Sequence, residues 1–183
     1  MSSQQSSEQN GPRRLEVFRA ESGEPLTETQ MPMEGVDESV TAAFSKLMEI
    51  GAAEAGGETV RCLFKEPKDD GLSLCYAWFK SGFVLPRHSH DADCVYYVVA
   101  GELKLGNQVL RKGDGFFVPN GAPYSYQAGP EGVEVLEFRN ATKFHIRFRN
   151  NDDAHWNRIA NSYRENAPRW SDETVPPSDR RAS

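Results

Sequence analysis

The 183-residue chain has no excess of basic residues. Its 21 Lys and Arg stand against 27 Asp and Glu, which makes the formal net charge −6 at pH 7. A protein that grips nucleic acid or an anionic membrane over a whole face needs a basic surface. We therefore expect neither nucleic acid nor a membrane among its partners.

Long apolar runs are also missing. No apolar stretch approaches the ~20 residues of a membrane-spanning helix. The N-terminal MSSQQSSEQNGPRR has no hydrophobic region of the kind found in secretory signals. There are only three cysteines, Cys62, Cys75 and Cys94, which cannot all pair and show no CxxC spacing. These features are typical of a cytoplasmic protein with reduced thiols.

What is present divides the chain into five segments. Both ends are poor in core-forming residues and bury too little apolar surface to offset their chain entropy. Asp37 and Asp152 are candidate N-caps for two packing helices, each with apolar residues on one face. We expect a mobile tail over 1–14, an extension with a packing helix over 15–58, a β-barrel over 59–149, a helix over 150–167 and an extended tail over 168–183.

Short strands with frequent turn residues fill the central segment. Gly106-Asn107, for example, is typical of a two-residue hairpin turn. Many short strands without helices between them predict a closed antiparallel barrel or jelly roll, so we expect an all-β fold with flanking N- and C-terminal helices. The expected strands are Thr59–Lys65, Leu72–Lys80, Cys94–Ala100, Glu102–Leu105, Gln108–Arg111, Gly115–Val118, Tyr124–Gln127, Val133–Arg139 and Lys143–Arg149.

Two of the four histidines, His88 and His90, are separated by one residue. Alternate residues of a strand point to the same face, so the two imidazoles can converge on one point. Neutral imidazole is the commonest metal ligand and suits Fe, Zn, Ni and Cu. Two histidines on a solvent-facing strand are the alternative interpretation.

The surroundings of this pair resemble the cupin superfamily. Its first motif is Gly, five residues, HxH, three or four residues, Glu, six residues and Gly. Here Gly82 and Gly101 stand at the two ends with these spacings, and Cys94 occupies the Glu position. The second motif is Gly, five residues, Pro-x-Gly, two residues, His, three residues and Asn. Its spacing fits from Gly113 onward, with Tyr124 at the His position and Ala128 at the Asn position.

The resemblance covers about residues 59–139 and implies a jelly-roll barrel with a divalent metal. Such cupins bind the metal through three His and one Glu, of which His88 and His90 are present. Cys94 as a thiolate and Tyr124 as a phenolate could complete the set if a metal lowered their pKa values. Two histidines plus water are the alternative, and the metal is Fe, Zn, Ni or Cu.

Cys94 also makes the chain similar to the cysteine dioxygenases. These are cupins in which the first-motif Glu is a Cys, cross-linked to a nearby Tyr beside a three-histidine iron. Tyr96, Tyr124 and Tyr126 are the candidate neighbours of Cys94 in this sequence. The third histidine of that set is missing, because we expect both His145 and His155 at the surface.

Strand parity predicts a cavity lined by tyrosines. If Cys94 and Tyr124 point into the barrel, so do Tyr96 and Tyr126. Aromatic walls with hydroxyl groups suit a small organic molecule, with an aromatic one as a candidate, although the tyrosines could equally fill the barrel. Arg87, at the mouth of the barrel, is a candidate for binding a substrate carboxylate, with a surface salt bridge as the alternative.

Three hypotheses for the function follow. The first is a metal-dependent enzyme, a dioxygenase by preference, with the metal on His88 and His90 and with Cys94 and Tyr124 as ligands or catalytic residues. The second is a non-catalytic cupin that binds a small ligand at a degenerate metal site. The third is a lyase or isomerase that uses Tyr124 as acid and base. The resemblance also implies a homodimer, with which the outward Tyr97 is consistent.

Overall fold

The computed structural model describes residues 14–52, 54–149 and 152–180. It contains ten strands among these residues: β1 (Glu24–Pro25), β2 (Met33–Glu34), β3 (Glu58–Lys65), β4 (Ser73–Phe79), β5 (His88–Ser89), β6 (Cys94–Leu105), β7 (Gln108–Arg111), β8 (Gly115–Val118), β9 (Gln127–Arg139) and β10 (Ile146–Phe148). The helices are α1 (Glu38–Glu49) and α2 (Asp153–Trp170), with 3-10 turns η1 (Ala20–Ser22) and η2 (Pro177–Asp179).

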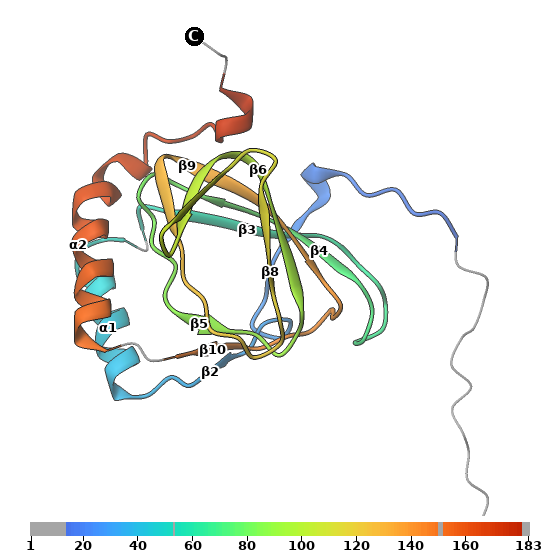
Figure 1. Ribbon diagram of the computed structural model, residues 1–183, viewed down its shortest axis with the longest axis horizontal. Helices are drawn as coiled ribbons and strands as arrows, with labels where there is room; N and C mark the ends of the chain where they lie inside the picture. Colours follow the sequence, from blue (N-terminus) through green and yellow to red (C-terminus); the bar gives the residue numbers. More distant parts are fainter. Residues whose placement is uncertain (1–13, 53, 150–151, 181–183) are drawn as a thin grey trace, which may run out of the picture.

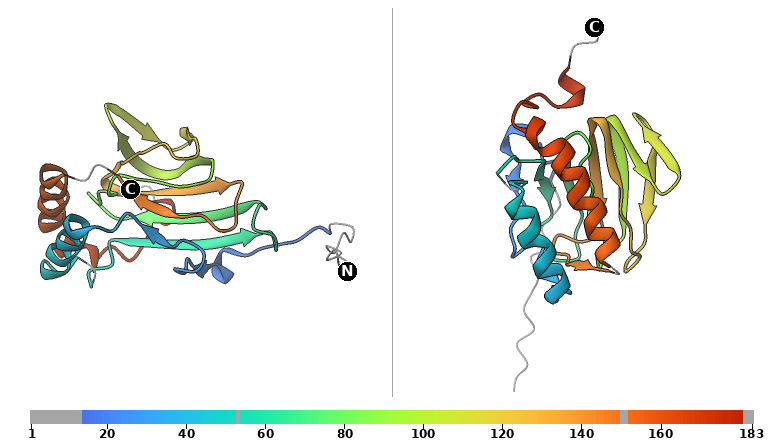
Figure 2. Two further views of the ribbon diagram at one scale, coloured as in Figure 1. Left: turned by 90° about the horizontal axis from the view of Figure 1, so that it is seen from below. Right: turned by 90° about the vertical axis from the view of Figure 1, so that its left-hand side faces the viewer.

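The strands form two sheets that enclose the core. The larger sheet is antiparallel and has the order β1-β3-β4-β9-β6-β7, with β8 also paired to β6. The smaller sheet has the order β2-β10-β5, in which β10 runs parallel to β2 and antiparallel to β5. Helices α1 and α2 lie side by side at one end of the sheets (Figure 1, Figure 2).

The expected closed barrel is wrong, because the two sheets stay separate. Two isolated bridges, Val84–Gln127 and His88–Tyr124, connect the segments that a closed barrel would join by continuous ladders. The expected strand Tyr124–Gln127 does not form as such, and Gln127 instead begins β9. Pro119 and Pro123, which precede this segment, have no N–H group to donate to a ladder, and they separate the end of β8 from the bridge at Tyr124.

Two long strands replace several of the expected short ones. The expected Cys94–Ala100 and Glu102–Leu105 are parts of one strand, β6, because β-bulges around Gly101 absorb the irregularity without ending the pairing with β9. Gly101 has a φ of +73°, which favours glycine at this position. On β6 the side chains of Cys94 and Tyr96 are buried and that of Tyr97 is exposed, which confirms the expected parity.

Both helices begin at the predicted caps. A side-chain oxygen of Asp37 accepts the Val40 N–H at 2.9 Å, and one of Asp152 accepts the His155 N–H at 2.8 Å. Helix α2 continues past the expected end at residue 167 to Trp170. The Trp170 side chain is fully buried, which explains why this last turn is retained despite Pro168.

The segment after α2 packs on the protein. The expected extended tail over 168–183 therefore begins as a helix, and up to residue 180 its contacts hold it in place. The N–H and hydroxyl groups of Ser178 donate to the buried Glu134 carboxylate at 2.6 and 2.9 Å. The expected N-terminal tail lies, apart from Arg14, outside the described residues. Among those described, no helix is long and apolar enough to cross a membrane.

Candidate functional site

His88 and His90 lie together on the inner side of the small sheet. Both are buried, with 2% and 6% of their surfaces exposed, and their ring centroids are 4.9 Å apart. Strand β5 and its bridge to Tyr124 place them there, because the backbone N–H groups of His88 and Tyr124 donate to each other's carbonyl oxygens. The convergence predicted from the HxH spacing is confirmed.

Backbone carbonyls fix the orientation of both rings. Nδ1 of His88 donates to the Pro86 oxygen at 2.6 Å, and Nδ1 of His90 donates to the His145 oxygen at 2.7 Å. Burial lowers the pKa of His88 to about 4, and burial together with the nearby Arg139 charge lowers that of His90 to about 2. Both imidazoles are therefore neutral at pH 7, with the proton on Nδ1 and a lone pair on Nε2.

Tyr124 uses the lone pair of His88. Its hydroxyl lies 2.9 Å from His88 Nε2, which must accept the hydrogen bond because Nδ1 carries the proton. The Tyr124 oxygen then accepts from the hydroxyl of Tyr96, with which it forms a short hydrogen bond. Burial raises the pKa of both phenols, so both remain protonated. The three side chains form a hydrogen-bonded chain in which Tyr96 donates to Tyr124 and Tyr124 donates to His88.

The chain continues to a buried ion pair that the sequence analysis missed. Arg139 Nη2 donates to the Tyr96 oxygen at 3.2 Å and pairs with the Glu137 carboxylate at 2.6 Å. Both side chains are almost fully buried, and the Arg139 guanidinium stacks 4.2 Å from the Phe144 ring centre. Its Nε and Nη1 atoms have no hydrogen-bond partner within the described residues. The alternation along β9 could have revealed the pair, since Glu137 and Arg139 share the parity of Val133 and the inward face.

Cys94 lies beside this network as a neutral thiol. It is buried, and its sulfur is 3.8 Å from the Val95 carbonyl oxygen. Burial raises the pKa of the thiol to about 12, and Tyr96 is its hydrogen-bonding neighbour. A cysteine side chain is shorter than the glutamate of the motif, so the Cys94 sulfur lies close to the backbone of β6, on the same face as Tyr96.

The other predicted residues divide between the interior and the surface. Tyr126 is buried, and its hydroxyl has no hydrogen-bond partner within the described part of the chain, so it lines the interior as expected. Arg87 is exposed, and its backbone N–H donates to Nε2 of His155. His145 is 44% exposed in its side chain and pairs with Glu34 at 2.6 Å, which agrees with a surface position.

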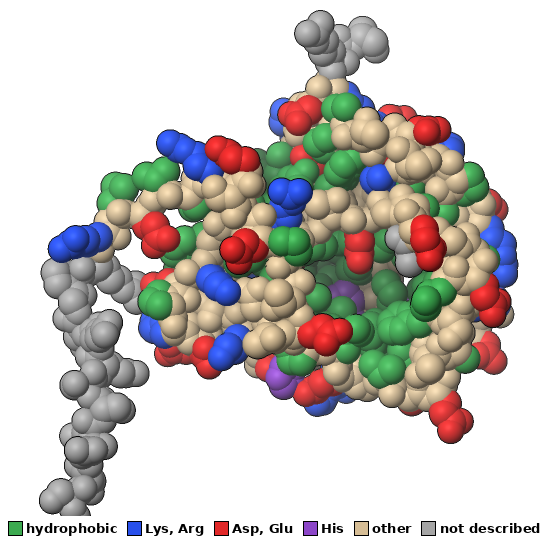
Figure 3. All heavy atoms as spheres, turned by 180° about the vertical axis from the view of Figure 1, so that it is seen from behind, with side chains coloured by type: hydrophobic (Ala, Val, Ile, Leu, Met, Phe, Trp, Pro, Cys, Tyr) green, Lys and Arg blue, Asp and Glu red, His purple; other side chains and the backbone are tan. Residues whose placement is uncertain are grey.

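A small polar cleft reaches His90 from outside. It has a volume of about 130 Å³, and Asp91, His145 and Arg149 are among the residues beside His90. The space-filling view from behind shows a hollow with a histidine side chain in its depth, and the side chains around this hollow are largely hydrophobic, unlike those that line the cleft (Figure 3).

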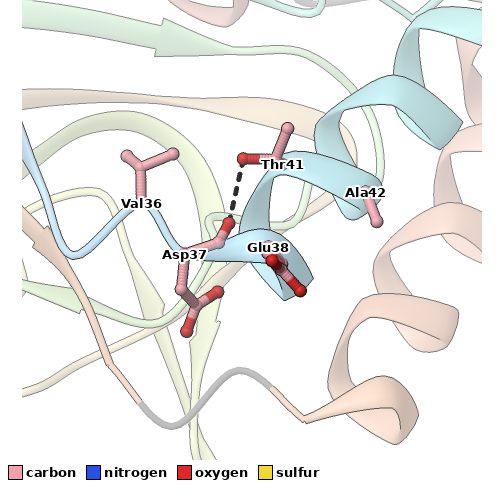
Figure 4. Close-up of a pocket in the computed structure, with 5 residues that line it drawn as sticks. All are labelled: Val36, Asp37, Glu38, Thr41 and Ala42. Atoms are coloured by element: carbon pink, nitrogen blue, oxygen red, sulfur yellow. Dashed lines mark hydrogen bonds between the residues drawn. The ribbon is translucent and has the colours of Figure 1, made fainter.

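A second, shallower depression lies at the start of α1 (Figure 4). Its polar groups are those of a helix cap, because the Thr41 hydroxyl donates to the Asp37 carbonyl at 2.9 Å. We therefore assign it no chemistry.

Comparison with known proteins identifies the family of the chain. The sequence model of the family described as Cupin matches residues 64–175, more than half of the chain. The chain belongs to the cupin family. The matched range contains both histidines, Tyr124 and the buried ion pair, so the recognised resemblance is confirmed. No curated protein matches the chain.

Solved cupin structures are similar to parts of the chain. An RmlC-like cupin from Shewanella frigidimarina is 29% identical over 46% of this chain and 76% of its own, with a TM-score of 0.39. KdgF from Halomonas sp. is 26% identical over 46% and 79%, with a TM-score of 0.39. The polyketide cyclase RemF from Streptomyces resistomycificus is 20% identical over 55% and 76%, with a TM-score of 0.46.

The candidate metal donors that the fold brings together are the two imidazoles and the Tyr124 phenol. Neutral imidazoles tied through Nδ1 to carbonyl oxygens have the protonation and support that histidine ligands need. Within the described residues, no group of three or more His, Cys, Asp and Glu could hold a metal ion, so Cys94 does not complete such a set. The third donor available is the Tyr124 oxygen. Nitrogen donors with a phenol suit a first-row transition metal better than Mg²⁺ or Ca²⁺.

Proposed function

We propose that this protein is an enzyme that acts on a small organic molecule beside a first-row transition metal held by His88 and His90. The observation that supports it most is the pair of buried, neutral imidazoles whose Nδ1 atoms are tied to backbone carbonyls. Each of these two rings, 4.9 Å apart, therefore has an unprotonated Nε2, which is the atom that a metal would bind. Tyr124 is the third donor of this proposal.

The residues of the chain then have distinct roles. A bound metal would supply Lewis acidity or a site for oxygen, and a dioxygenase remains our first reaction class. Tyr96 and Arg139 hold the Tyr124 hydroxyl from behind, which fixes its direction. Because burial raises the pKa of Tyr124, its hydroxyl stays protonated at neutral pH and can donate a hydrogen bond to a substrate, whereas complete transfer of its proton would need a bound metal to lower that pKa. A lyase or isomerase would need that transfer, with Tyr124 as a general acid.

A second candidate is a metal-free cupin that binds a small ligand. Two observations favour it: the Tyr124 hydroxyl already occupies Nε2 of His88, and the buried Arg139 guanidinium adds a positive charge near both imidazoles. A nearby positive charge disfavours a further cation in a low-dielectric interior. In this case Tyr126 and the unpartnered Arg139 donors are the groups that a ligand could engage.

Elemental analysis of the purified full-length protein separates the two. The first proposal expects about one transition-metal ion per chain in the wild type, after loading with Fe, Zn, Ni or Cu and removal of excess metal. His88→Ala should lose the metal, whereas His155→Ala, which changes a histidine on helix α2, should keep it. If the wild type holds no metal, or if His88→Ala holds as much, the metal proposal is wrong.

Tyr124→Phe tests the role of the third donor in the same assay. If Tyr124 is a ligand, the variant should bind the metal more weakly. If the hydroxyl only competes for the His88 lone pair, the variant should bind more tightly. The second candidate instead expects a small ligand that raises the melting temperature equally with and without a chelator.

A further inference from the structure

Cys62 and Cys75 face each other across two neighbouring strands. In the antiparallel register of β3 and β4 they stand directly opposite each other, so both side chains lie on the same face of the large sheet. Residues opposite each other in an antiparallel pair have Cα atoms about 4.5 or 5.5 Å apart. Both separations lie within the range that disulfides span, about 4.4–6.8 Å.

The two thiols are neighbours across the strand pair and are not equivalent. Cys75 is fully buried, whereas Cys62 is partly exposed near the edge of the sheet, where only the two-residue strand β1 pairs with β3. The hydrogen bond from the Cys75 thiol is the main reason why the pKa of Cys62 falls to about 7. The same hydrogen bond, together with burial, raises the pKa of Cys75. An accessible thiol with a pKa near neutrality is therefore adjacent to a buried partner thiol.

Strand β3 is irregular next to Cys62. The pairing register shifts between Cys62 and Phe64, which leaves Leu63 as the extra residue of a β-bulge. A bulge bends its strand and gives the backbone room to adjust when a bond forms between the two sulfurs.

We propose that Cys62 and Cys75 form a reversible intramolecular disulfide when the protein meets a mild oxidant such as hydrogen peroxide. The Cys62 thiolate attacks one peroxide oxygen and becomes a sulfenic acid, and the other oxygen leaves as water. The Cys75 sulfur then attacks the Cys62 sulfur, and the sulfenic oxygen leaves as a second water. Both thiol hydrogens end in water, the two sulfurs are oxidised, and the two peroxide oxygens are reduced.

The position of this cysteine pair connects it to the site formed by His88, His90, Tyr96 and Tyr124, which we call the cup. Cys75 stands opposite Glu137 in the pairing of β4 with β9, and Glu137 stands opposite Tyr96 in the pairing of β9 with β6. Cys75 is thus the direct cross-strand neighbour of Glu137, a member of the ion pair that supports the tyrosines. The disulfide would modify the wall of the site and not the metal donors themselves, so it stands apart from the function proposed above.

Thiol counting on the reduced full-length protein tests the inference. After a stoichiometric dose of hydrogen peroxide, the protein is denatured, alkylated and analysed by intact mass and peptide mapping. We expect one alkylated cysteine, Cys94, in place of three, a mass about 2 Da lower before alkylation, and one peptide pair joined through Cys62 and Cys75. Dithiothreitol should restore all three thiols.

Matched variants identify the partners. Cys94→Ser should form the same cross-link, whereas Cys62→Ser, at a partly exposed position, should keep both remaining thiols at the same dose. The proposal is wrong if all three wild-type thiols stay alkylatable, if the cross-link contains Cys94, or if it joins two chains.

Discussion

Replacing Arg139 with methionine should strongly destabilise the protein. Methionine has a similar length and fills the space against Phe144, but it leaves the Glu137 carboxylate buried without the partner that now lies 2.6 Å away. Removing one member of a buried ion pair costs about 3–5 kcal/mol. The Tyr96 hydroxyl loses its donor as well.

The magnitude can be bounded from the proton that the lone carboxylate would take up. Protonating an ordinary glutamate side chain costs about 3.7 kcal/mol at pH 7 and about 1 kcal/mol at pH 5. In the variant, the folded state then binds a proton that the unfolded state does not, so its stability relative to the wild type falls as the pH rises. We expect a deficit of about 4 kcal/mol at pH 7 that shrinks by about 2–3 kcal/mol at pH 5.

Urea unfolding at the two pH values measures this deficit. The double variant Glu137→Gln with Arg139→Met should recover much of the loss, because no charge is then left buried. Arg180→Met is the matched control, since Arg180 pairs with Glu131 at 2.6 Å but at the surface, where such a pair contributes about 0–1 kcal/mol. The reasoning fails if Arg139→Met costs no more than Arg180→Met, or if its deficit is the same at both pH values.

Three further predictions use other parts of the structure. The metal-free protein should lose stability as the pH falls from about 6.5 to 4, by about 1.4 kcal/mol per pH unit from His88, because only the unfolded imidazole takes up a proton there; in urea titrations His88→Gln should lower this slope, and an unchanged slope contradicts it. We expect the exposed side chains of Val95, Tyr97 and Phe117, on adjacent strands, to form a homodimer interface. Tyr97→Glu should then halve the mass measured by light scattering, and a monomeric wild type refutes the interface. If Cys94 is cross-linked to a tyrosine, the intact mass stays about 2 Da low even after dithiothreitol, and an unmodified mass in active protein excludes the thioether.

The sequence could predict the tyrosines and histidines of the cup because their positions follow from the period of a strand. Tyr96 shares the parity of Cys94, and His88 and His90 sit two residues apart, so their common face needs no knowledge of the rest of the chain. Spacing also carried the family assignment, since the motifs preserve distances along the chain even where Cys94 and Tyr124 replace the usual residues.

Arg139 and Glu137 were harder to place because charged side chains are usually expected at the protein surface. Each is tolerated inside because the other lies 2.6 Å away on the same face of β9, so the pair is recognised only when the two residues are considered together. The open barrel had a different cause. Whether Pro123 interrupts a ladder depends on which strand it would have joined, and this is a property of the assembled sheets.

The two proposed functions differ in the use of one lone pair. The carbonyl of Pro86 holds the proton of His88 on Nδ1, so Nε2 can only accept, and the Tyr124 hydroxyl now uses it. Each hydrogen bond behind it, from Arg139 to Tyr96 and on to Tyr124, follows the same direction. A metal on Nε2 would displace the Tyr124 proton, which then has to leave or turn away, while Arg139 at the far end of the chain would still donate. Under the first proposal, metal binding at Nε2 and the present hydrogen bond from Tyr124 would therefore exclude each other, and the affinity for a metal would depend on how firmly Tyr124 holds its proton against His88.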